Sequence, residues 1–292
     1  MPDLRIPALG DIMISLQDGG KRTETSVGEI KMGEQEKRRQ YLIRALLRER
    51  PEYEAMEIPV QEEEQRQLLR GLMNIRAPKR CSEEFLNIQD AYLQEAAAEK
   101  GIVELSGLEP VREGIYLWQG DITSLKCDAI VNAANSGMTG CYVPNHKCID
   151  NCIHSFAGVQ LRLECARMME EQGHEEPTGQ AKITKAYNLP CRYVLHTVGP
   201  IVQGKLTEKH CALLRSCYLS CLELAAAYGL ESVAFCCIST GVFCFPNDKA
   251  AQIAVHTVQE YLEKIPDSSV KKVIFNVFKD EDRRIYEKIL GS

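Results

Sequence analysis

The sequence predicts an α/β fold with a mostly parallel or mixed sheet, preceded by a helical extension. Two observations lead to this prediction. From Gly33 to about Lys100, apolar residues recur at three-to-four spacing among charged residues, which is the pattern of amphipathic helices. After Gly101, short β-type runs alternate with longer helical segments, as in folds whose strands are joined by helices. We therefore predict two parts, a helical extension over residues 1–104 and an α/β domain over residues 105–292.

The composition is that of an ordinary globular protein, because 45% of the 292 residues are hydrophobic and 26% are charged. A formal net charge of −6 gives no reason to expect binding to nucleic-acid phosphates. The N-terminus lacks a basic stretch followed by an apolar one, and no apolar run approaches the roughly 20 residues that cross a membrane. We expect a soluble, cytoplasmic protein that contacts neither a membrane nor nucleic acid.

Three helical stretches make up the predicted extension: residues 34–50, 59–78 and 82–101. Ser82 is a candidate N-cap for the last of them, and Gly101 ends it. Residues 1–30 show no sustained period, and we interpret them as a loose lead-in. The charged residues of the extension form either a solvated face or a surface that docks a partner.

The α/β domain contains six strand-like runs and four helical segments. The strand-like runs are 114–123, 127–135, 179–189, 192–200, 232–240 and 270–278, and the helical segments are 156–173, 208–229, 248–264 and 280–290. In such sheets ligands bind beyond the carboxyl ends of the strands. The loops that follow the strands are therefore the first places to look for a site.

Three of these loops carry polar residues suited to binding. Ser239, Thr240 and Gly241 provide hydroxyls and backbone N–H groups ahead of a helix, which suits a phosphate. Asp121 can accept a hydrogen bond from an exocyclic amine, or it can simply cap a turn. The NAAN segment, residues 132–135, ends a strand with amides that bind sugar hydroxyls or satisfy loop backbone groups equally well. Taken singly, none of the three distinguishes a binding loop from an ordinary turn.

The segment GCYVPNHKCIDNCIH places three cysteines and two histidines close together. Cys141, His146 and Cys148 have C-x4-H-x-C spacing, and thiolate and imidazole are ligands that suit Zn²⁺. Three protein ligands leave a position for water or substrate, whereas a fourth, Cys152 or His154, would close the site and make it structural. The alternatives are chance crowding in a chain with 13 cysteines, or a disulfide, which a reducing cytoplasm disfavours.

Three segments, in order, resemble the macrodomain family, an α/β fold that binds ADP-ribose: GDITSLKCDAIVNAANS, PTGQAKITKAYNLPCRYVLHTVGP and SVAFCCISTGVFCFP. The resemblance covers about residues 105–290. It implies a macrodomain-like mixed central sheet flanked by helices on both faces, with the helical extension in front of it. After the Asn-rich strand the chain departs from most hydrolytic members, with GCYVPNHKC in place of a glycine-rich loop and IDNCIH in place of Val-Asp-Gly-Ala-Ile-His. These replacements resemble a zinc-containing subgroup of microbial macrodomain hydrolases that is associated with sirtuin-type ADP-ribosyltransferases.

The resemblance assigns roles to single residues. Asp121 would bind the adenine amino group, the backbone of Ile122 would contact the ligand, Asn135 would hold the distal ribose, and Phe243 would lie against that ribose. The loop over residues 239–242 would wrap the diphosphate. The full ligand-binding set is Asp121, Ile122, Asn135, Cys148, Ile149, Asp150, Asn151, Ser239, Thr240, Gly241, Val242 and Phe243.

The remaining assignments concern chemistry. Asn135 and Asp150 are the predicted catalytic residues, and Cys141, His146 and Cys148 are the predicted ligands of a Zn²⁺ cofactor. The resulting hypothesis is a zinc-dependent hydrolase that removes mono-ADP-ribose from protein side chains by cleaving a glycosidic or ester bond. Its partners would be ADP-ribose, a mono-ADP-ribosylated protein and a sirtuin-type ADP-ribosyltransferase system. The alternative is a non-catalytic module that binds ADP-ribose and holds a structural zinc.

Overall fold

The computed structural model describes residues 33–53 and 55–291, so the predicted lead-in over residues 1–30 lies outside the described residues. Three α-helices and a short 3-10 turn form an N-terminal helical unit: α2 (Glu34–Arg48), η1 (Pro51–Tyr53), α3 (Glu62–Ile75) and α4 (Glu83–Lys100). The predicted N-cap of α4 is confirmed, because the Ser82 hydroxyl accepts a hydrogen bond of 3.2 Å from the backbone N–H of Phe85.

The helical unit has a hydrophobic core of its own. Leu42, Ile43, Leu68 and Ile75 are almost completely buried in this core, and Val159 of the α/β part packs into it as well. Burial of one such side chain contributes about 1.5–3 kcal/mol relative to its exposure. The helical unit is therefore held against the rest of the molecule by an apolar interface as well as by its own packing.

A seven-stranded mixed sheet forms the centre of the α/β part, with the strand order β2-β3-β9-β8-β5-β7-β6. The strands are β2 (Pro110–Arg112), β3 (Ile115–Gln119), β5 (Ala129–Ala134), β6 (Ala181–Lys185), β7 (Tyr193–Val198), β8 (Ser232–Phe235) and β9 (Lys272–Val277). The five inner strands are parallel, and the two edge strands, β2 and β6, are antiparallel to their neighbours. A separate parallel pair joins β1 (Val103–Glu104) to β4 (Leu125–Lys126).

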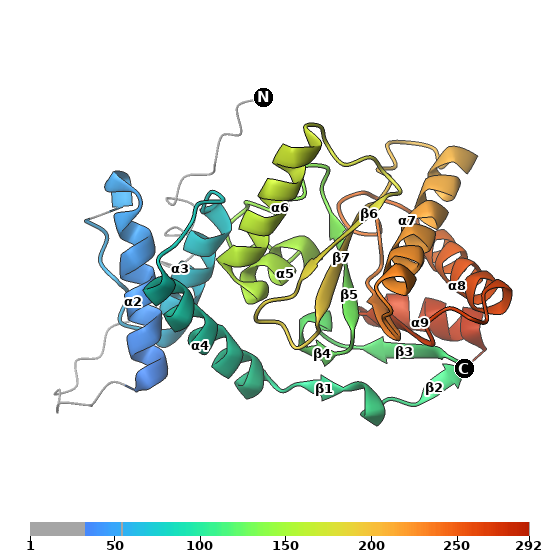
Figure 1. Cartoon of the computed structure of the whole chain (residues 1–292), viewed down its shortest axis with the longest axis horizontal. Helices are drawn as coiled ribbons and strands as arrows, with labels where there is room; N and C mark the ends of the chain where they lie inside the picture. Colours follow the sequence, from blue (N-terminus) through green and yellow to red (C-terminus); the bar gives the residue numbers. More distant parts are fainter. Residues whose placement is uncertain (1–32, 54, 292) are drawn as a thin grey trace.

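Helices cover both faces of this sheet, as the sequence predicts. The α/β helices are α5 (Ile149–Ala157), α6 (Val159–Gln172), α7 (Glu208–Ala227), α8 (Asn247–Lys264) and α9 (Asp280–Leu290). Figure 1 shows α7, α8 and α9 packed together on one side, while α5 and α6 lie between the sheet and the helical unit. Among the described residues, no helix is both long and apolar enough to cross a membrane.

The predicted helix over residues 156–173 is divided in two at Gly158. This glycine has φ +97°, which an α-helix cannot accommodate. The interruption is stabilised from outside, because Asn188 donates its side-chain amide to the carbonyl of Ala157 (3.0 Å) and Gln89 of α4 accepts from the N–H of Val159 (3.0 Å). The helical unit thus supplies the cap of α6, a long-range contact that helical periodicity does not reveal.

Replacing a fully buried residue of the helical unit tests how much that unit contributes to stability. Leu68→Ala is expected to lower the free energy of unfolding by about 2–5 kcal/mol, because it leaves a cavity in the core. Val60→Ala, at a position 93% exposed just before α3, is the control and is expected to change it by less than about 0.5 kcal/mol. Urea denaturation followed by circular dichroism measures both variants. Equal midpoints would mean that this core does not contribute to cooperative unfolding.

Candidate active site

The parallel strands bring the three predicted binding loops to one edge of the sheet. Asp121 follows β3, Ser239 follows β8 and Asn135 follows β5, and these strands run in the order β3-β9-β8-β5. Because the carboxyl ends of parallel strands meet at the same edge, residues more than a hundred positions apart line one surface. The structure therefore arranges the three loops in a row along this edge, which suits an extended ligand, rather than around one point.

Asp121 lies at one end of this edge and caps the 3-10 turn η3 (Ile122–Ser124). Its Oδ1 accepts hydrogen bonds from the N–H (2.9 Å) and the hydroxyl (2.6 Å) of Thr123, and its Oδ2 pairs with the ammonium of Lys100 from α4. Burial alone would raise the pKa of Asp121, but its hydrogen bonds with Lys100 and Thr123 lower it. The carboxylate is therefore a charged acceptor at neutral pH. Ile122 is only 1% exposed, so its side chain is not available to a ligand.

The loop after β8 has the features of an anion-binding turn. Ser239 adopts a left-handed conformation, with φ +64°, and its buried hydroxyl has no hydrogen-bond partner among the described residues. Across residues 33–53 and 55–291, the backbone N–H groups of Gly241, Val242 and Phe243 likewise donate to no group of the chain. Successive free N–H groups in a turn form a concave site for a negatively charged oxygen. Gly199, at the end of β7, leaves the necessary space, because a Cβ there would lie 2.0 Å from the Ser239 hydroxyl oxygen.

Asn135 and Asp150 meet at the other end of the edge. Asn135 donates to Asp150 Oδ2 (3.2 Å) and to the carbonyl of Gly140 (3.2 Å), and it accepts from the N–H of Gly137 (3.0 Å). Asp150 Oδ1 accepts from the amide of Asn132 (2.8 Å). Asp150 is only 5% exposed, and this burial raises the pKa of its carboxyl to about 6. Both oxygens are thus used to orient the two asparagines of NAAN.

A buried histidine, His196, contacts Asn132 from the neighbouring strand β7. The Asn132 amide donates to His196 Nδ1 (3.1 Å), so the ring proton is on Nε2, which donates to the Thr184 hydroxyl (2.9 Å). Burial lowers the pKa of His196 to about 3. The neutral ring fixes the orientation of Asn132 and, through it, the carboxylate of Asp150.

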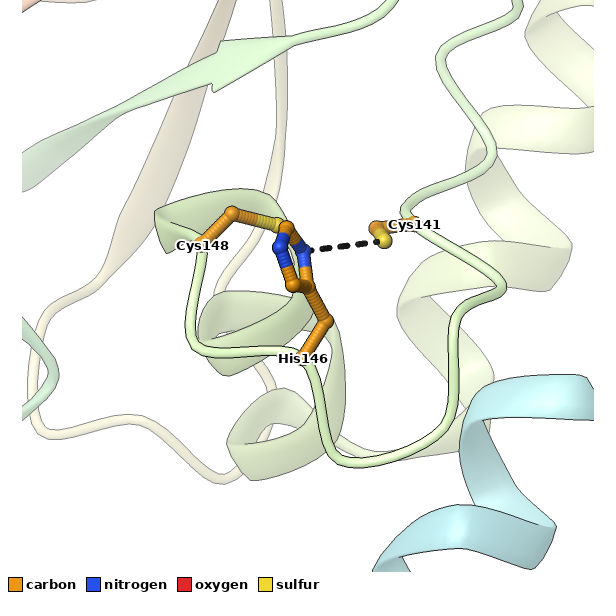
Figure 2. Close-up of side chains that lie close together, drawn as sticks. All are labelled: Cys141, His146 and Cys148. Carbon is orange, nitrogen blue, oxygen red and sulfur yellow. Dashed lines mark hydrogen bonds between the residues drawn. The ribbon is translucent and has the colours of Figure 1, made fainter. Parts of the chain in front are cut away.

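The three predicted zinc ligands lie together on the loop before α5, as Figure 2 shows. Their Sγ and ring-nitrogen atoms all lie within 4.8 Å of one another, and Cys141 Sγ is 3.6 Å from His146 Nδ1. A hydrogen bond from the Cys148 thiol lowers the pKa of Cys141 to about 5, and the same interaction raises the pKa of Cys148. A thiolate, a second thiol and an imidazole at this separation fit a Zn²⁺ ion with three protein ligands.

The two candidates for a fourth ligand lie outside this group. His154 belongs to a separate buried set with Cys165 and His196, where Cys165 Sγ is 3.9 Å from His196 Nε2. Cys152 instead accepts from Arg70 of α3 at 3.4 Å. The described residues therefore provide a three-ligand group rather than a closed four-ligand one.

Asn151 is a predicted ligand-binding residue, but its side chain forms hydrogen bonds within the protein instead. It is completely buried, and its amide donates to the carbonyls of Cys141 (3.3 Å) and Val143 (2.9 Å). The side chain holds the cysteine loop against α5, and the Asn151 carbonyl accepts from the Ser155 hydroxyl (2.7 Å), so the structure does not present Asn151 to a ligand. Cys148 and Ile149 start the same helix, with the Cys148 sulfur accepting from the Asn151 N–H at 3.4 Å.

Sequence reasoning missed three residues of this region. Phe278, directly after β9, is 75% exposed, and its carbonyl accepts a hydrogen bond from the side-chain amide of Gln119 (3.3 Å). An aromatic residue immediately after a strand was a signal that could have identified it. Lys100 and Arg70 come from the helical unit, and no local pattern connects them to loops that lie far along the chain.

Comparisons with known proteins agree with this geometry. Residues 131–254 match the Macro domain family. A Treponema medium relative named protein-ADP-ribose hydrolase is 60% identical over 261 residues, which is 88% of this chain and 99% of the relative. A Fusarium oxysporum f. sp. cubense protein named a probable bifunctional ADP-ribose hydrolase/ADP-ribosyltransferase is 40% identical over 242 residues, covering 77% of this chain and 40% of that protein. The crystal structure of a Trypanosoma brucei macrodomain in complex with ADP-ribose superposes with a TM-score of 0.60 at 32% identity, covering 76% of this chain and 95% of that one.

The fold and the site define an α/β protein with a ligand edge suited to a nucleotide. The relatives place it more narrowly: the chain belongs to the macrodomain family. The predicted fold is thereby confirmed.

The buried His196 predicts a loss of stability in acid. Its pKa is lower in the folded state than the ordinary value of about 6.5, so the unfolded chain binds more protons, and stability is lost as the pH falls below that value. Between pH 7 and pH 5 this one group is expected to remove about 2 kcal/mol from the free energy of unfolding. Urea denaturation of His196→Gln should show a smaller difference between the two pH values than the wild type. His256→Gln, at an exposed position of α8, should keep the wild-type difference; an unchanged pH dependence in His196→Gln would refute the assignment.

Proposed function

We propose that this protein is a zinc-dependent hydrolase that releases mono-ADP-ribose from modified protein side chains. Removal of ADP-ribose from proteins is the activity named for the Treponema relative, which aligns with nearly the whole chain. The proposal that the hydrolase depends on zinc rests on the group of Cys141, His146 and Cys148 close to Asn135. This arrangement places a candidate metal site next to the proposed nucleotide-binding edge.

The ADP part of the ligand is proposed to lie along the strand ends from Asp121 to the loop after β8. Asp121 accepts the adenine amino group, and the exposed ring of Phe278 offers a face on which a base can stack. The free N–H groups of Gly241, Val242 and Phe243, with the unpartnered Ser239 hydroxyl, bind the diphosphate oxygens. Thr240 helps to shape this turn, because its hydroxyl donates to the carbonyl of Cys237 (3.0 Å).

The distal ribose is proposed to contact Asn135, with the ring of Phe243 against its other side. Asp150 acts by orientation, because its buried carboxylate holds the amides of Asn132 and Asn135 rather than facing the surface. A ribose fixed between these groups presents the bond to its protein acceptor toward the cysteine loop. Such positioning accounts for much of the rate increase in reactions between bound groups.

Cys141, His146 and Cys148 are proposed to hold the zinc ion. When bound, zinc provides a Lewis acid that polarises a substrate oxygen or lowers the pKa of a water molecule. The thiol-rich ligand set suits a reducing compartment, which agrees with the expected cytoplasmic location. The modified substrate is proposed to come from a sirtuin-type ADP-ribosyltransferase; the Fusarium relative, named for both activities, supports a pairing of hydrolase and transferase.

Zinc removal separates a hydrolase from a binding module. We expect ADP-ribose release from a mono-ADP-ribosylated protein to stop when a chelator removes the metal and to return when zinc is added. Cys148→Ala should abolish both zinc binding and release, since it deletes one of three ligands. Metal content and released ADP-ribose are measured on the same samples.

Cys152→Ala is the matched variant, because Cys152 lies four residues along the same segment but outside the three-ligand group. It should retain one equivalent of zinc and measurable release. If the zinc-loaded protein binds ADP-ribose but releases none from several acceptor linkages, the protein is the non-catalytic binding module instead. If Cys148→Ala keeps a full equivalent of zinc, the ligand set is wrong.

Asp121→Asn tests the adenine end of the proposed site. The asparagine keeps the shape but loses the charge that strengthens the hydrogen bond to the adenine amine, a change of about 1–1.5 kcal/mol, or about 5- to 10-fold in affinity. Isothermal titration calorimetry with ADP-ribose measures this loss, and zinc content should not change. Asp248→Asn, an exposed carboxylate in the first turn of α8, should bind ADP-ribose like the wild type. Equal affinities for both variants would exclude Asp121 from the site.

A further inference from the structure

The cysteine loop, residues 140–148, is held by side chains from the helical unit as well as by its own neighbours. Arg70 of α3 donates through Nη2 to the carbonyl of His146 (2.8 Å) and to Asn151 Oδ1 (2.9 Å). One turn later, Asn74 accepts from the backbone N–H of Asn145 (2.9 Å) and donates to the hydroxyl of Ser155 (2.8 Å). Residues four apart lie on the same face of a helix, so one face of α3 is directed at this loop.

A third residue joins the same elements from the other side. Arg162 of α6 is nearly fully buried and donates through Nη1 to the carbonyls of Met73 (3.1 Å), Asn74 (2.6 Å) and Arg76 at the end of α3. Its remaining nitrogens donate to the carbonyls of Thr139 (2.7 Å) and Cys141 (3.4 Å). The end of α3 and the start of the cysteine loop are therefore bound to one guanidinium group.

The loop itself has little internal structure to fix the three ligands. Residues 141–148 form no helix or strand, and Asn145 adopts a left-handed conformation with φ +55°. Gly140, with φ +83°, lies so close to the His154 ring that a Cβ would come within 2.7 Å of it. A metal site needs its ligands held close to their bound geometry, and groups that hydrogen-bond around the ligands supply that order. Here the groups on α3, Arg70 and Asn74, lie 76 and 71 residues from their partners in the loop, and Arg162 of α6 lies 21 residues from Cys141.

We infer that α3 of the helical unit is part of the metal site, and that Arg70 is a positioning residue for the ligands of the cysteine loop. This inference rests on the proposed zinc site. Arg70 binds the carbonyl of the ligand residue His146 itself, and through Asn151 it supports the segment that begins at the ligand residue Cys148. The helical extension thereby acquires a role in the chemistry of the α/β part, although Arg70 is not proposed to contact ADP-ribose or the metal.

The test compares two arginines of α3 in the full chain. Arg70→Met removes the guanidinium but keeps an aliphatic stem, which preserves packing near the Phe156 ring. Arg66→Met is the control, because Arg66 lies one turn earlier, is exposed, and forms ion pairs with Glu62 and Glu99 rather than contacts with the loop among the described residues. Zinc affinity is measured by competition with a chromogenic chelator, and ADP-ribose affinity by calorimetry on the metal-free chains.

Arg70→Met is expected to bind zinc about 10- to 100-fold more weakly than the wild type, with ADP-ribose affinity within twofold. Hydrogen exchange of residues 141–148 in the metal-free chain should be faster in this variant, and exchange in the central strands should not change. Arg66→Met should match the wild type in all three measurements. These measurements separate positioning from a general loss of folding, which would affect the ADP-ribose site and the strands too.

Wild-type zinc affinity in Arg70→Met, with unchanged hydrogen exchange of the loop, overturns the inference while leaving the proposed function intact. A wild-type chain that takes up no zinc overturns the metal part of the proposed function, and the inference with it. Equal weakening in Arg66→Met and Arg70→Met would also overturn the inference, because the effect would then come from the charge of α3 rather than from contact with the loop.

Discussion

The buried carboxylate of Asp150 is the group on which the arrangement of the site depends. A charged or polar group at 5% exposure must be hydrogen-bonded, and the amides of Asn132 and Asn135 satisfy it from the end of β5. These bonds join the central sheet to the first turn of α5, which begins directly after the proposed zinc ligand Cys148. The same asparagines reach His196 on one side and Gly140 on the other. The proposed ribose end of the binding edge and the cysteine loop therefore share one set of buried hydrogen bonds.

The helical unit is integrated with the α/β part through several polar contacts. Lys100 pairs with Asp121 at the proposed adenine end, Gln89 caps α6, and Arg70 and Asn74 bind the cysteine loop. Each contact provides a hydrogen-bond or ion-pair partner for a backbone group or a carboxylate of the α/β part. These contacts are spread along α3 and α4, so the helical unit supports residues at both ends of the proposed ligand. Its residues therefore serve contacts with the α/β part as well as the core of the unit itself.

Much of this could be predicted from the sequence because the relevant signals are local. The helices, the inner strands and the cap at Ser82 follow from periodicity and turn chemistry, and Cys141, His146 and Cys148 are within eight residues of one another. The break at Gly158 could not be predicted, since its stabilising groups come from Gln89 and Asn188. Nor could the direction of the Asn151 side chain, because an amide on a helix can face a ligand or the loop beneath it equally well.

By itself, the sequence determined an α/β fold with a helical extension, and it placed the predicted binding loops at strand ends and the three proposed zinc ligands on one short loop. Only the tertiary structure decided that Asp150 turns inward to the asparagines, that Cys152 and His154 lie outside the proposed ligand group, and that Arg70 and Lys100 contact residues of the candidate site. The reason is physical: spacing along the chain specifies which elements form, whereas the partner of a buried polar group depends on which distant segment packs against it. Those partners come from helices that precede the sheet by many residues.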